Sequence, residues 1–352
     1  MSILFAILLF SILIFVHELG HFAAAKLSGV QVNEFSLFMG PAIWKKQVGE
    51  TLYAVRTIPI GGYCAMEGED GGSDNPRAFD KAAWWKRFII LIAGAAMNFV
   101  VGVILMVLVY LPMTEAAAPV IESFTEYSTL NEENGLQTGD RILEVDGEKI
   151  YVFSDFSLLM SLNPGDVHDL VVDRNGERVV LEDFFMERHE AVAPDGTKQM
   201  MYGMNFTLQK MTVADRVQYA WMQSLDTVRM VRLSLQMLLS GQAGLADMSG
   251  PVGIVQQMSV VAERSPTALD ALLNMLYFGA FIAINLAVMN LLPIPALDGG
   301  RIVGVLVTAL VQAVTHKKID PKYEGYLHGV GMIALLGLMG IIMFKDIVFL
   351  FK

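Results

Sequence analysis

Two histidines and a glutamate lie within an otherwise apolar stretch, ILIFVHELGHFAAAKLSG, at residues 12–29. On a helix, His17 and His21 fall one turn apart on the same face. Two imidazoles in this arrangement can bind one Zn²⁺, and Glu18 can serve as the general base for an attacking water. A buried histidine is more often a hydrogen-bonded core residue. Inside a membrane span, however, three polar groups must be satisfied without water, and this favours a metal site.

A catalytic zinc usually has three protein ligands, so a third ligand must come from elsewhere at the same depth. Asp298 follows an apolar run at about 272–292. In the motif NLLPIPALDGG that joins them, Pro293 and Pro295 must end the helix. If the N-terminus and this run both start outside, His17 lies ~24 Å and the end of the run ~27 Å into a ~30 Å hydrocarbon core. We therefore predict Asp298 as the third ligand. A helix-capping aspartate in a cytoplasmic loop is the alternative.

The composition predicts a polytopic α-helical membrane protein. The chain has 352 residues, of which 54% are hydrophobic and 17% charged, and a soluble domain of this length is rarely so apolar. Four runs approach the ~20 residues that span a hydrocarbon core, and we predict four transmembrane helices at about 2–25, 88–111, 272–292 and 330–351. A net charge of −11 argues against a nucleic-acid partner. The single cysteine, Cys64, excludes an intramolecular disulfide framework.

Basic residues predict the orientation of these spans. They cluster between the first and second runs and again between the third and fourth: Lys26, Lys81, Lys86, Arg87, Lys317 and Lys318. By the positive-inside rule, both connections are cytoplasmic. Both termini and the long connection at 112–271 are then extracytoplasmic. The first run has no positive segment before it and contains HELGH, so we interpret it as a span and not as a signal peptide.

The long connection has the pattern of a folded domain. Its segment NGLQTGDRILEVDGEKI is rich in turns, SDFSLLMSL predicts a short helix, and two predicted strands flank the RNG turn at 174–176. The Gly-Asp pair at 139–140 and the VDG sequence resemble a PDZ domain. We therefore expect a membrane part with a β-hairpin region at 1–117, a PDZ-like α+β domain at 118–208, an amphipathic helix and connecting segment at 209–271, and a second membrane part at 272–352.

Taken together, these motifs resemble the site-2 protease family, and most closely its bacterial type that cleaves the membrane-spanning regulator of sigma-E. HELGH lies in the first span, NLLPIPALDGG in the third, and the PDZ-like domain between the second and third. FMGP at 38–41 and PIGGYCAMEGED at 59–70 resemble the family's membrane-associated β-hairpin and substrate loop. MSGPVGI at 248–254 resembles the segment before the third span. Many sigma-E-type relatives carry two PDZ domains, whereas this chain has room for one.

The resemblance implies an intramembrane zinc endopeptidase of the bacterial cytoplasmic membrane, with Zn²⁺ on His17, His21 and Asp298 and with Glu18 as the catalytic base. Its substrates would be transmembrane segments of single-pass proteins in the lipid bilayer, such as anti-sigma factors or signal-peptide remnants. An upstream site-1-type protease would first trim the outer domain of the substrate.

Cleavage of a transmembrane helix requires local unwinding, and the unwound backbone needs new hydrogen-bond partners in lipid. The stretches VQVNEFSLFMGPAIW and ETLYAVRTIPIGG predict strands that can pair with it. Gly61 and Gly62 would allow close approach, although an ordinary turn explains them equally well. Asn290 can bind substrate backbone, as the family's asparagine at this place does, or it can cap the helix end. Pro293 of the same motif is placed with the substrate-binding residues.

Two other classes of function fit parts of the pattern. A catalytically silent membrane scaffold would bind peptides through the PDZ-like domain, but it would not need HELGH and Asp298 together. A transporter with a broken third helix would be expected to have a repeated half, which the sequence lacks. The four remaining histidines are expected to lie outside the site: His168, His189, His316 and His328.

Overall fold

The computed structural model describes residues 2–69, 72–131, 135–163, 165–192, 198–242, 244, 250–316 and 322–350. The chain forms two compact units, Met1–Val109 with Thr227–Lys352, and Tyr110–Asp226. The first unit holds the long apolar helices, and the second is built around a sheet. The four domain ranges expected from the sequence, with a PDZ-like domain at 118–208, stay a prediction.

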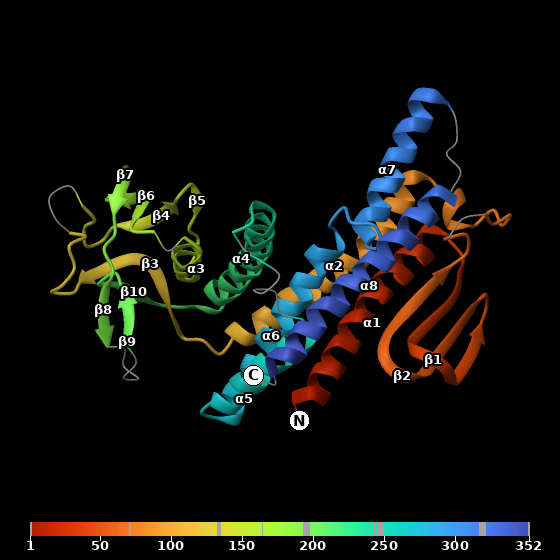
Figure 1. The fold of residues 1–352 in the computed structure, drawn as a ribbon, viewed down its shortest axis with the longest axis horizontal. Coiled ribbons are helices and arrows are strands. Elements are labelled where there is room, and N and C mark those ends of the chain that lie inside the picture. The colour runs from red at the N-terminus through yellow and green to blue at the C-terminus, as the bar shows by residue number, and fades with distance from the viewer. Residues whose placement is uncertain are drawn as a thin grey trace. The chain divides into compact units, whose positions relative to one another are not determined.

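Long helices dominate the first unit (Figure 1). They are α1 (Ser2–Ser28), α2 (Trp84–Tyr110), α6 (Ala268–Asn290), α7 (Asp298–Thr315) and α8 (Lys322–Leu350), with the shorter α5 (Pro251–Arg264) before α6 and the 3₁₀ helix η1 (Phe79–Lys81) before α2. Among the described residues, these five long helices are apolar enough to cross a membrane, where the sequence predicted four spans.

The additional candidate is α7. Its first turn, DGGR, is polar and rich in glycine, so it is the least apolar of the five helices. Figure 1 shows α7 pointing away from the end of this unit where the N-terminus lies. Helix α8 returns toward that end, where the C-terminus also lies. Termini at the same end require an even number of crossings, so we expect α7 to continue α6 without adding a crossing.

Small residues let the helices of this unit approach closely. A Cβ on Gly20 of α1 would lie 2.3 Å from the carbonyl oxygen of Ala93 on α2. A Cβ on Gly102 of α2 would lie 2.5 Å from Cγ1 of Ile284 on α6. Neither position has room for a side chain, and these contacts bring α1, α2 and α6 together.

A buried acidic residue joins α8 to α5. The Asp346 side chain is buried, and its Oδ2 accepts hydrogen bonds from the backbone amides of Gly250 at 2.9 Å and Gly253 at 3.0 Å. Both amides lie at the N-terminus of α5, where free N–H groups and the helix dipole favour a negative charge. The polar interruption near the end of the last apolar run thus has a structural partner.

Two long strands, β1 (Val32–Val48) and β2 (Thr51–Met66), form an antiparallel sheet against α1. Residues 34–37 pair both with 62–65 and with 52–55, so the bent strands make a wider sheet than a simple hairpin. Residues at one end of the sheet join the core of α1 and α2: Val32, Phe35, Cys64 and Met66 with Ala25, Ile90 and Leu91. Ile43, Trp44 and Val48 are exposed. An apolar surface of this kind fits the expected association with a membrane.

The second unit contains one antiparallel sheet with the strand order β10-β3-β4-β6-β7, to which β5 adds beside β4. Its elements are β3 (Glu115–Phe124), β4 (Arg141–Val145), β5 (Glu148–Lys149), α3 (Phe153–Leu162), β6 (Val167–Arg174), β7 (Glu177–Phe185), β8 (His189–Val192), β9 (Lys198–Met201), β10 (Met204–Lys210) and the first part of α4 (Val213–Ser240). Strands β8 and β9 pair with each other as a separate hairpin.

Two local predictions in this unit are confirmed. Helix α3 covers the SDFSLLMSL stretch, and its Phe153 and Phe156 pack on Phe206 of β10. The RNG turn joins β6 to β7. In it, Asn175 and Gly176 have φ angles of 55° and 89°, which are the positive values of a type I′ hairpin turn.

We expect a reporter fused after His316 to be cytoplasmic, because α7 continues α6 and does not cross again. Fusions after Gly147 and at the C-terminus should both be extracytoplasmic under the positive-inside orientation. Alkaline phosphatase, which is active only outside, and green fluorescent protein, which fluoresces only inside, measure each position in parallel. Phosphatase activity after His316, with none at the C-terminus, would show that α7 is a fifth crossing.

Candidate metal centre

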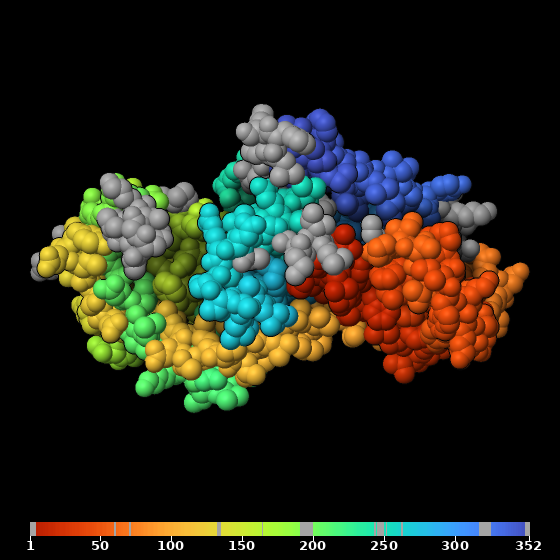
Figure 2. All heavy atoms as spheres, turned by 90° about the horizontal axis from the view of Figure 1, so that it is seen from below, coloured from red at the N-terminus to blue at the C-terminus, as the bar shows by residue number. Residues whose placement is uncertain are grey.

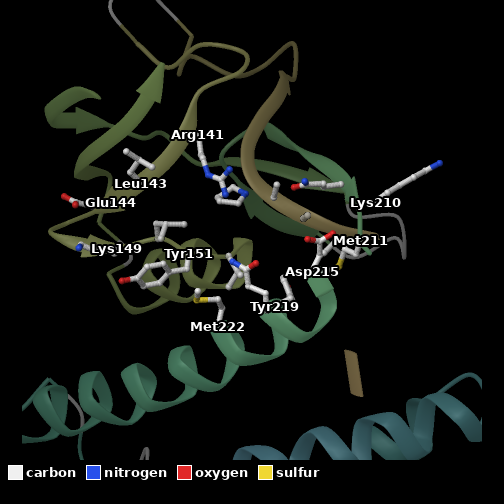
Figure 3. A pocket seen from close by; sticks show the side chains of 18 of the residues that line it. Arg141, Leu143, Glu144, Lys149, Tyr151, Lys210, Met211, Asp215, Tyr219 and Met222 are labelled. Carbon is white, nitrogen blue, oxygen red and sulfur yellow. The ribbon is translucent and has the colours of Figure 1, made fainter. Parts of the chain in front are cut away.

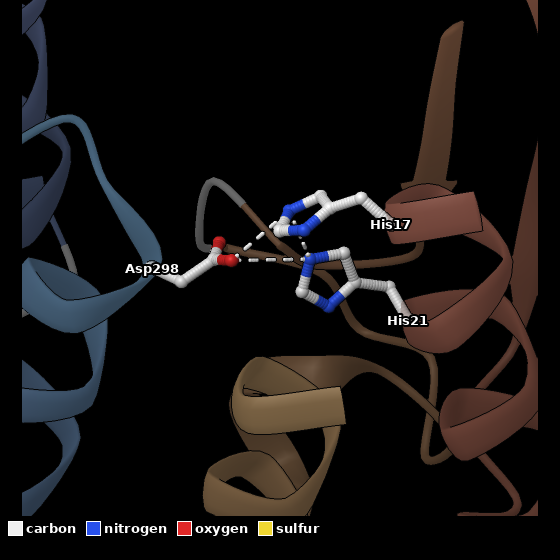
Figure 4. A group of neighbouring side chains, drawn as sticks. All are labelled: His17, His21 and Asp298. Carbon is white, nitrogen blue, oxygen red and sulfur yellow. Dashed lines mark hydrogen bonds and ion pairs between the residues drawn. The ribbon is translucent and has the colours of Figure 1, made fainter. Parts of the chain in front are cut away.

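Two histidines of α1 and the first residue of α7 meet at one point (Figure 4). Nε2 of His17 lies 3.1 Å from Oδ2 of Asp298, and Nε2 of His21 lies 3.3 Å from the same oxygen. The two Nε2 atoms are 3.1 Å apart. Both histidines are buried, and the Asp298 side chain is 17% exposed. Within the described part of the chain, this is the one group of ligand-type side chains close enough to hold a metal ion.

The geometry of this group fits a zinc ion. Ligand atoms about 2.0–2.1 Å from a tetrahedral zinc lie about 3.3 Å from one another. The three separations here, 3.1, 3.1 and 3.3 Å, are close to that value. Oδ2 of Asp298 is buried and, among the described residues, has no hydrogen-bond partner of satisfactory geometry. A buried carboxylate oxygen without a donor is costly, and a cation between the three atoms removes that cost.

Neighbouring groups orient both imidazoles. Nδ1 of His21 lies 2.8 Å from the backbone carbonyl oxygen of Ile90, so Nδ1 carries the proton and donates it there. The lone pair on Nε2 of His21 is then free for a metal. Nδ1 of His17 lies 3.4 Å from the side-chain amide of Asn290. The amide atom placed nearest the ring is the nitrogen, Nδ2. Flipped about its last bond, the amide would present its oxygen to Nδ1–H and hold His17 in the same tautomer as His21.

The loop that carries Asp298 is fixed by the last helix. Pro293 and Pro295 interrupt the chain between α6 and α7, as predicted. Ala296 has a φ of 84°, a left-handed conformation that is uncommon for residues other than glycine. Its amide donates a hydrogen bond to Nδ1 of His328 on α8, at 3.0 Å. His328 is not one of the three grouped side chains, but it holds the loop two residues before the predicted ligand.

Two further contacts hold the start of α7, and the sequence predicted neither. A Cβ on Gly331 of α8 would lie 2.5 Å from Cβ of Pro295, so α8 packs directly on the ligand loop. On α7 itself, Arg301 forms an ion pair with Glu69 in the turn after β2. Arg301 lies about one turn after Asp298, and the ion pair therefore ties the end of β2 to the helix that supplies the third ligand. Glu69 lies within the PIGGYCAMEGED motif and Arg301 directly follows NLLPIPALDGG, but a motif does not reveal which residue contacts which.

Glu18 lies against strand β2. Its Oε2 accepts a hydrogen bond from the backbone amide of Cys64 at 3.0 Å. A Cβ on Gly62 would lie 4.0 Å from Cγ of Glu18 and 2.9 Å from the carbonyl oxygen of Ser36. Gly61 has a φ of 75°, which favours glycine. Gly61 thus provides a turn of the backbone, and Gly62 is the glycine that lies beside the glutamate.

The cysteine and three other histidines do not join the group formed by His17, His21 and Asp298. Burial raises the pKa of the Cys64 thiol, so the thiol keeps its proton, and only a thiolate is a good zinc ligand. His168 is in the second unit and lies 2.9 Å from Asp146. His189 is on β8, and His316 follows the last residue of α7.

Known proteins resemble the chain over nearly its whole length. A family model described as Peptidase family M50 matches residues 5–338. A Clostridium acetobutylicum protein named "Putative zinc metalloprotease" is 34% identical over 352 residues, which cover 99% of this chain and 98% of that protein. A Clostridium perfringens protein of the same description is 35% identical over 353 residues and 99% of both chains. The Bacillus subtilis "Regulator of sigma-W protease RasP" is 26% identical over 427 residues and 98% of both chains.

Gly94 of α2 provides a test of the site's geometry. A Cβ there would lie 2.4 Å from Nε2 of His21 and 2.8 Å from Cε1 of His17. We expect Gly94→Ala to displace an imidazole and to reduce bound zinc from about one per chain to a small fraction of that. Gly340→Ala is the matched control, because a Cβ on Gly340 meets no atom within 4 Å in the described structure. Mass spectrometry of metals in the purified proteins gives the zinc content. Equal zinc in both variants would contradict the placement of the two histidines.

Proposed function

The chain belongs to peptidase family M50, the site-2 protease family, and is a zinc metalloprotease; from this premise we propose that it is an intramembrane endopeptidase. It cleaves transmembrane segments of single-pass proteins in the bacterial cytoplasmic membrane. The observation that carries the proposal is the convergence of His17, His21 and Asp298 close to Glu18 and strand β2. A zinc site, a general base and a strand edge are what peptide hydrolysis in a membrane needs.

His17, His21 and Asp298 would hold the zinc, which when bound supplies a Lewis acid that acidifies water and polarises a peptide carbonyl. Glu18 takes the proton of the attacking water and delivers it to the leaving amine. The amide of Cys64 fixes the carboxylate of Glu18 through Oε2. Oε1 is then the oxygen that carries the proton, and the base keeps one orientation through the reaction.

Strand β2 offers one amide to an unwound substrate. The backbone amide of Cys64 donates a hydrogen bond to the Glu18 carboxylate at 3.0 Å, and that of Met66 donates to the Glu69 carboxylate at 3.3 Å. Successive residues of a strand alternate in direction, so the amide of Gly62 points to the same side as these two. The substrate main chain pairs at Gly62 by strand addition. Gly62 lies close to Glu18, and this supports placing the scissile segment of the substrate at Gly62.

Asn290 and Pro293 come from the end of α6 and the loop that follows it. Asn290 ends α6, and its side-chain amide lies beside His17. A side-chain amide has both an acceptor oxygen and an NH₂ donor, so Asn290 can orient the imidazole and also donate a hydrogen bond to a substrate carbonyl. Pro293 follows in the loop, where it keeps the chain out of a helix and lets the backbone line the site. Gly61 contributes by letting β2 turn before Gly62.

The substrate class is proposed by analogy with a relative. The Bacillus subtilis protein is named a regulator of sigma-W protease, and anti-sigma factors or signal-peptide remnants are the substrates proposed for this chain. Its PDZ-like domain at 118–208 lies outside the membrane together with both termini. An upstream site-1-type protease trims the outer domain of the substrate before the membrane cut.

A catalytically silent scaffold that binds peptides through the PDZ-like domain is the alternative. The buried oxygen of Asp298 beside two imidazoles weighs against it. A scaffold would carry the free-energy cost of that oxygen without using the metal site that offsets it.

Metal content and cleavage should separate in two variants. Glu18→Gln should keep about one zinc per chain and lose cleavage by about 10²-fold or more, because it removes the base and leaves the ligands. Asp298→Ala should lose both. Metal analysis of purified protein and cleavage of a tagged single-pass protein in liposomes give the two measurements. Full zinc retention in Asp298→Ala would remove Asp298 from the ligand set. A wild-type protein without zinc or cleavage would favour the scaffold.

Trimming of the substrate should control the rate. We expect a test protein without its outer domain to be cleaved at least about tenfold faster than one with a folded outer domain, the effect of ~1.4 kcal/mol in activation free energy. The reason is that a bulky domain tethered between the second and third spans limits which substrates approach. Deleting 118–208 should abolish the difference while Glu18 remains essential. Equal rates for both substrates in the wild type would contradict this role.

A further inference from the structure

Strand β2 is attached to α1 at a second point besides Glu18. Ser11 of α1 is buried, with 5% of its surface exposed, and its Oγ lies 2.9 Å from the carbonyl oxygen of Pro59 on β2. The same Oγ lies 2.7 Å from the carbonyl oxygen of Ile7, one turn earlier on α1. Figure 2 shows α1 in red beside the orange strands β1 and β2. The Ser11 hydroxyl therefore joins the helix that carries HELGH to the strand proposed to bind substrate.

The attached segment of β2 is a bulge. Ile58 of β2 pairs with Met39 of β1. The next pair along β2 is Gly62 with Leu37. Four steps along β2 therefore lie opposite two steps along β1, and β2 has two additional residues in this interval. Gly61 provides the turn of the backbone with its φ of 75°. Bulges of this kind bend a strand and often lie next to active sites.

The Pro59 carbonyl depends on this hydroxyl. Among the described residues, none of 59–61 is paired with β1, and a proline has no N–H with which to join a ladder. The Ile7 carbonyl, in contrast, lies within α1 and accepts the backbone amide four residues later. Helix α1 is apolar enough to cross a membrane, where a backbone carbonyl without a donor is costly. The single proton of the hydroxyl therefore stabilises the structure most when Ser11 donates it to Pro59.

The two attachments of β2 lie on one face of α1. Ser11 and Glu18 are seven residues apart, which is close to two full turns, and the rise between them is ~10.5 Å. From Pro59 to Cys64, a fully extended strand of five steps would span ~16.5 Å. The bulge takes up this difference in length. Gly62 is then held between two fixed points on the helix that supplies the proposed base.

We propose that Ser11 is a positioning residue for proteolysis. By holding the Pro59 carbonyl, it sets the place of Gly62 along α1 and thereby determines which substrate bond meets Glu18. This inference rests on the proposed function, in which the substrate main chain pairs at Gly62. Reacting atoms must come within about 3–3.5 Å of each other. A slip of one residue along a strand, ~3.3 Å, brings a neighbouring peptide bond to the base.

The test compares the positions of the cut in the wild type and in Ser11→Ala. Each full-length protein is reconstituted in liposomes with a tagged single-pass substrate, and mass spectrometry of the products identifies and quantifies every cut. We expect the wild type to cut mainly one bond. Ser11→Ala should cut that bond about tenfold more slowly and should also cut neighbouring bonds. Bound zinc should stay at about one per chain, because the contacts that hold the proposed ligands do not involve Ser11.

Two variants separate positioning from packing. Ser11→Thr keeps the hydroxyl and should restore the wild-type cut. Ser224→Ala is the matched control, because Ser224 is also buried on a helix and its hydroxyl donates to the carbonyl of Ala220, one turn earlier. It removes the same group from the same kind of helical contact but away from β2. Its rate and cut positions should equal those of the wild type.

A change in the second unit should also leave the cut positions unchanged. That unit contains a pocket of about 630 Å³ with Leu143 and Tyr219 in its wall (Figure 3). Every residue that lines the pocket belongs to this unit. Leu143→Trp therefore narrows a cavity without altering β2, and the same bond should be cut whatever the rate.

Unchanged rate and cut positions in Ser11→Ala would overturn the inference. A lower Tm with unchanged cut positions would assign Ser11 a packing role alone, and loss of zinc would place its effect at the metal; either result overturns the inference, as does a Ser11→Thr protein that behaves like Ser11→Ala. New cut positions in Ser224→Ala or Leu143→Trp would show that they report general damage. A wild-type protein that cleaves no substrate would instead refute the proposed function, and that outcome is seen without any Ser11 variant.

Discussion

A carboxylate oxygen lies buried against two imidazoles in the membrane unit, and the helices around it must hold these three side chains in place. Oδ2 of Asp298 lies within 3.3 Å of Nε2 on both His17 and His21, and no donor among the described residues satisfies it. In apolar surroundings, such an oxygen is stable only beside a cation. The proposed ligands come from α1 and α7, which lie far apart in the sequence. Ligand geometry has to hold within about 0.5 Å, so the packing of these helices is part of the metal chemistry.

The proposed ligands are held from different directions by elements that contribute no ligand themselves. Helix α2 supplies the Ile90 carbonyl to His21 and has a glycine where any side chain would strike the imidazoles. Helix α8 holds the loop before Asp298 through His328. The turn after β2 holds α7 through the ion pair of Glu69 with Arg301. Such outer contacts fix the orientation of ligands and tune their affinity for metal. The site is therefore a property of the whole unit and not of the HELGH helix alone.

The parts of this arrangement that the sequence predicts are those with local causes. His17 and His21 share a face because of helical periodicity, the RNG turn follows from the chemistry of its asparagine and glycine, and the break before Asp298 follows from two prolines. The roles of His328 and Arg301 are not local, because each contacts a segment far away in sequence. The doubled pairing of residues 34–37 also depends on how two strands bend. Helix α7 was missed because its polar first turn lowers the hydropathy of a short helix.

Strand β2 couples the proposed base to the proposed substrate site. The Cys64 amide that orients Glu18 belongs to the same strand edge as the Gly62 amide. Two residues along a strand span about 6.6 Å, so a substrate paired at Gly62 lies at a fixed register to the base. A helical substrate cannot take that register, because its rise is about 1.5 Å per residue and its amides are already bonded within the helix. In the proposed function, unwinding and alignment with Glu18 are then one event, which gives the β-sheet beside the proposed metal centre a physical role.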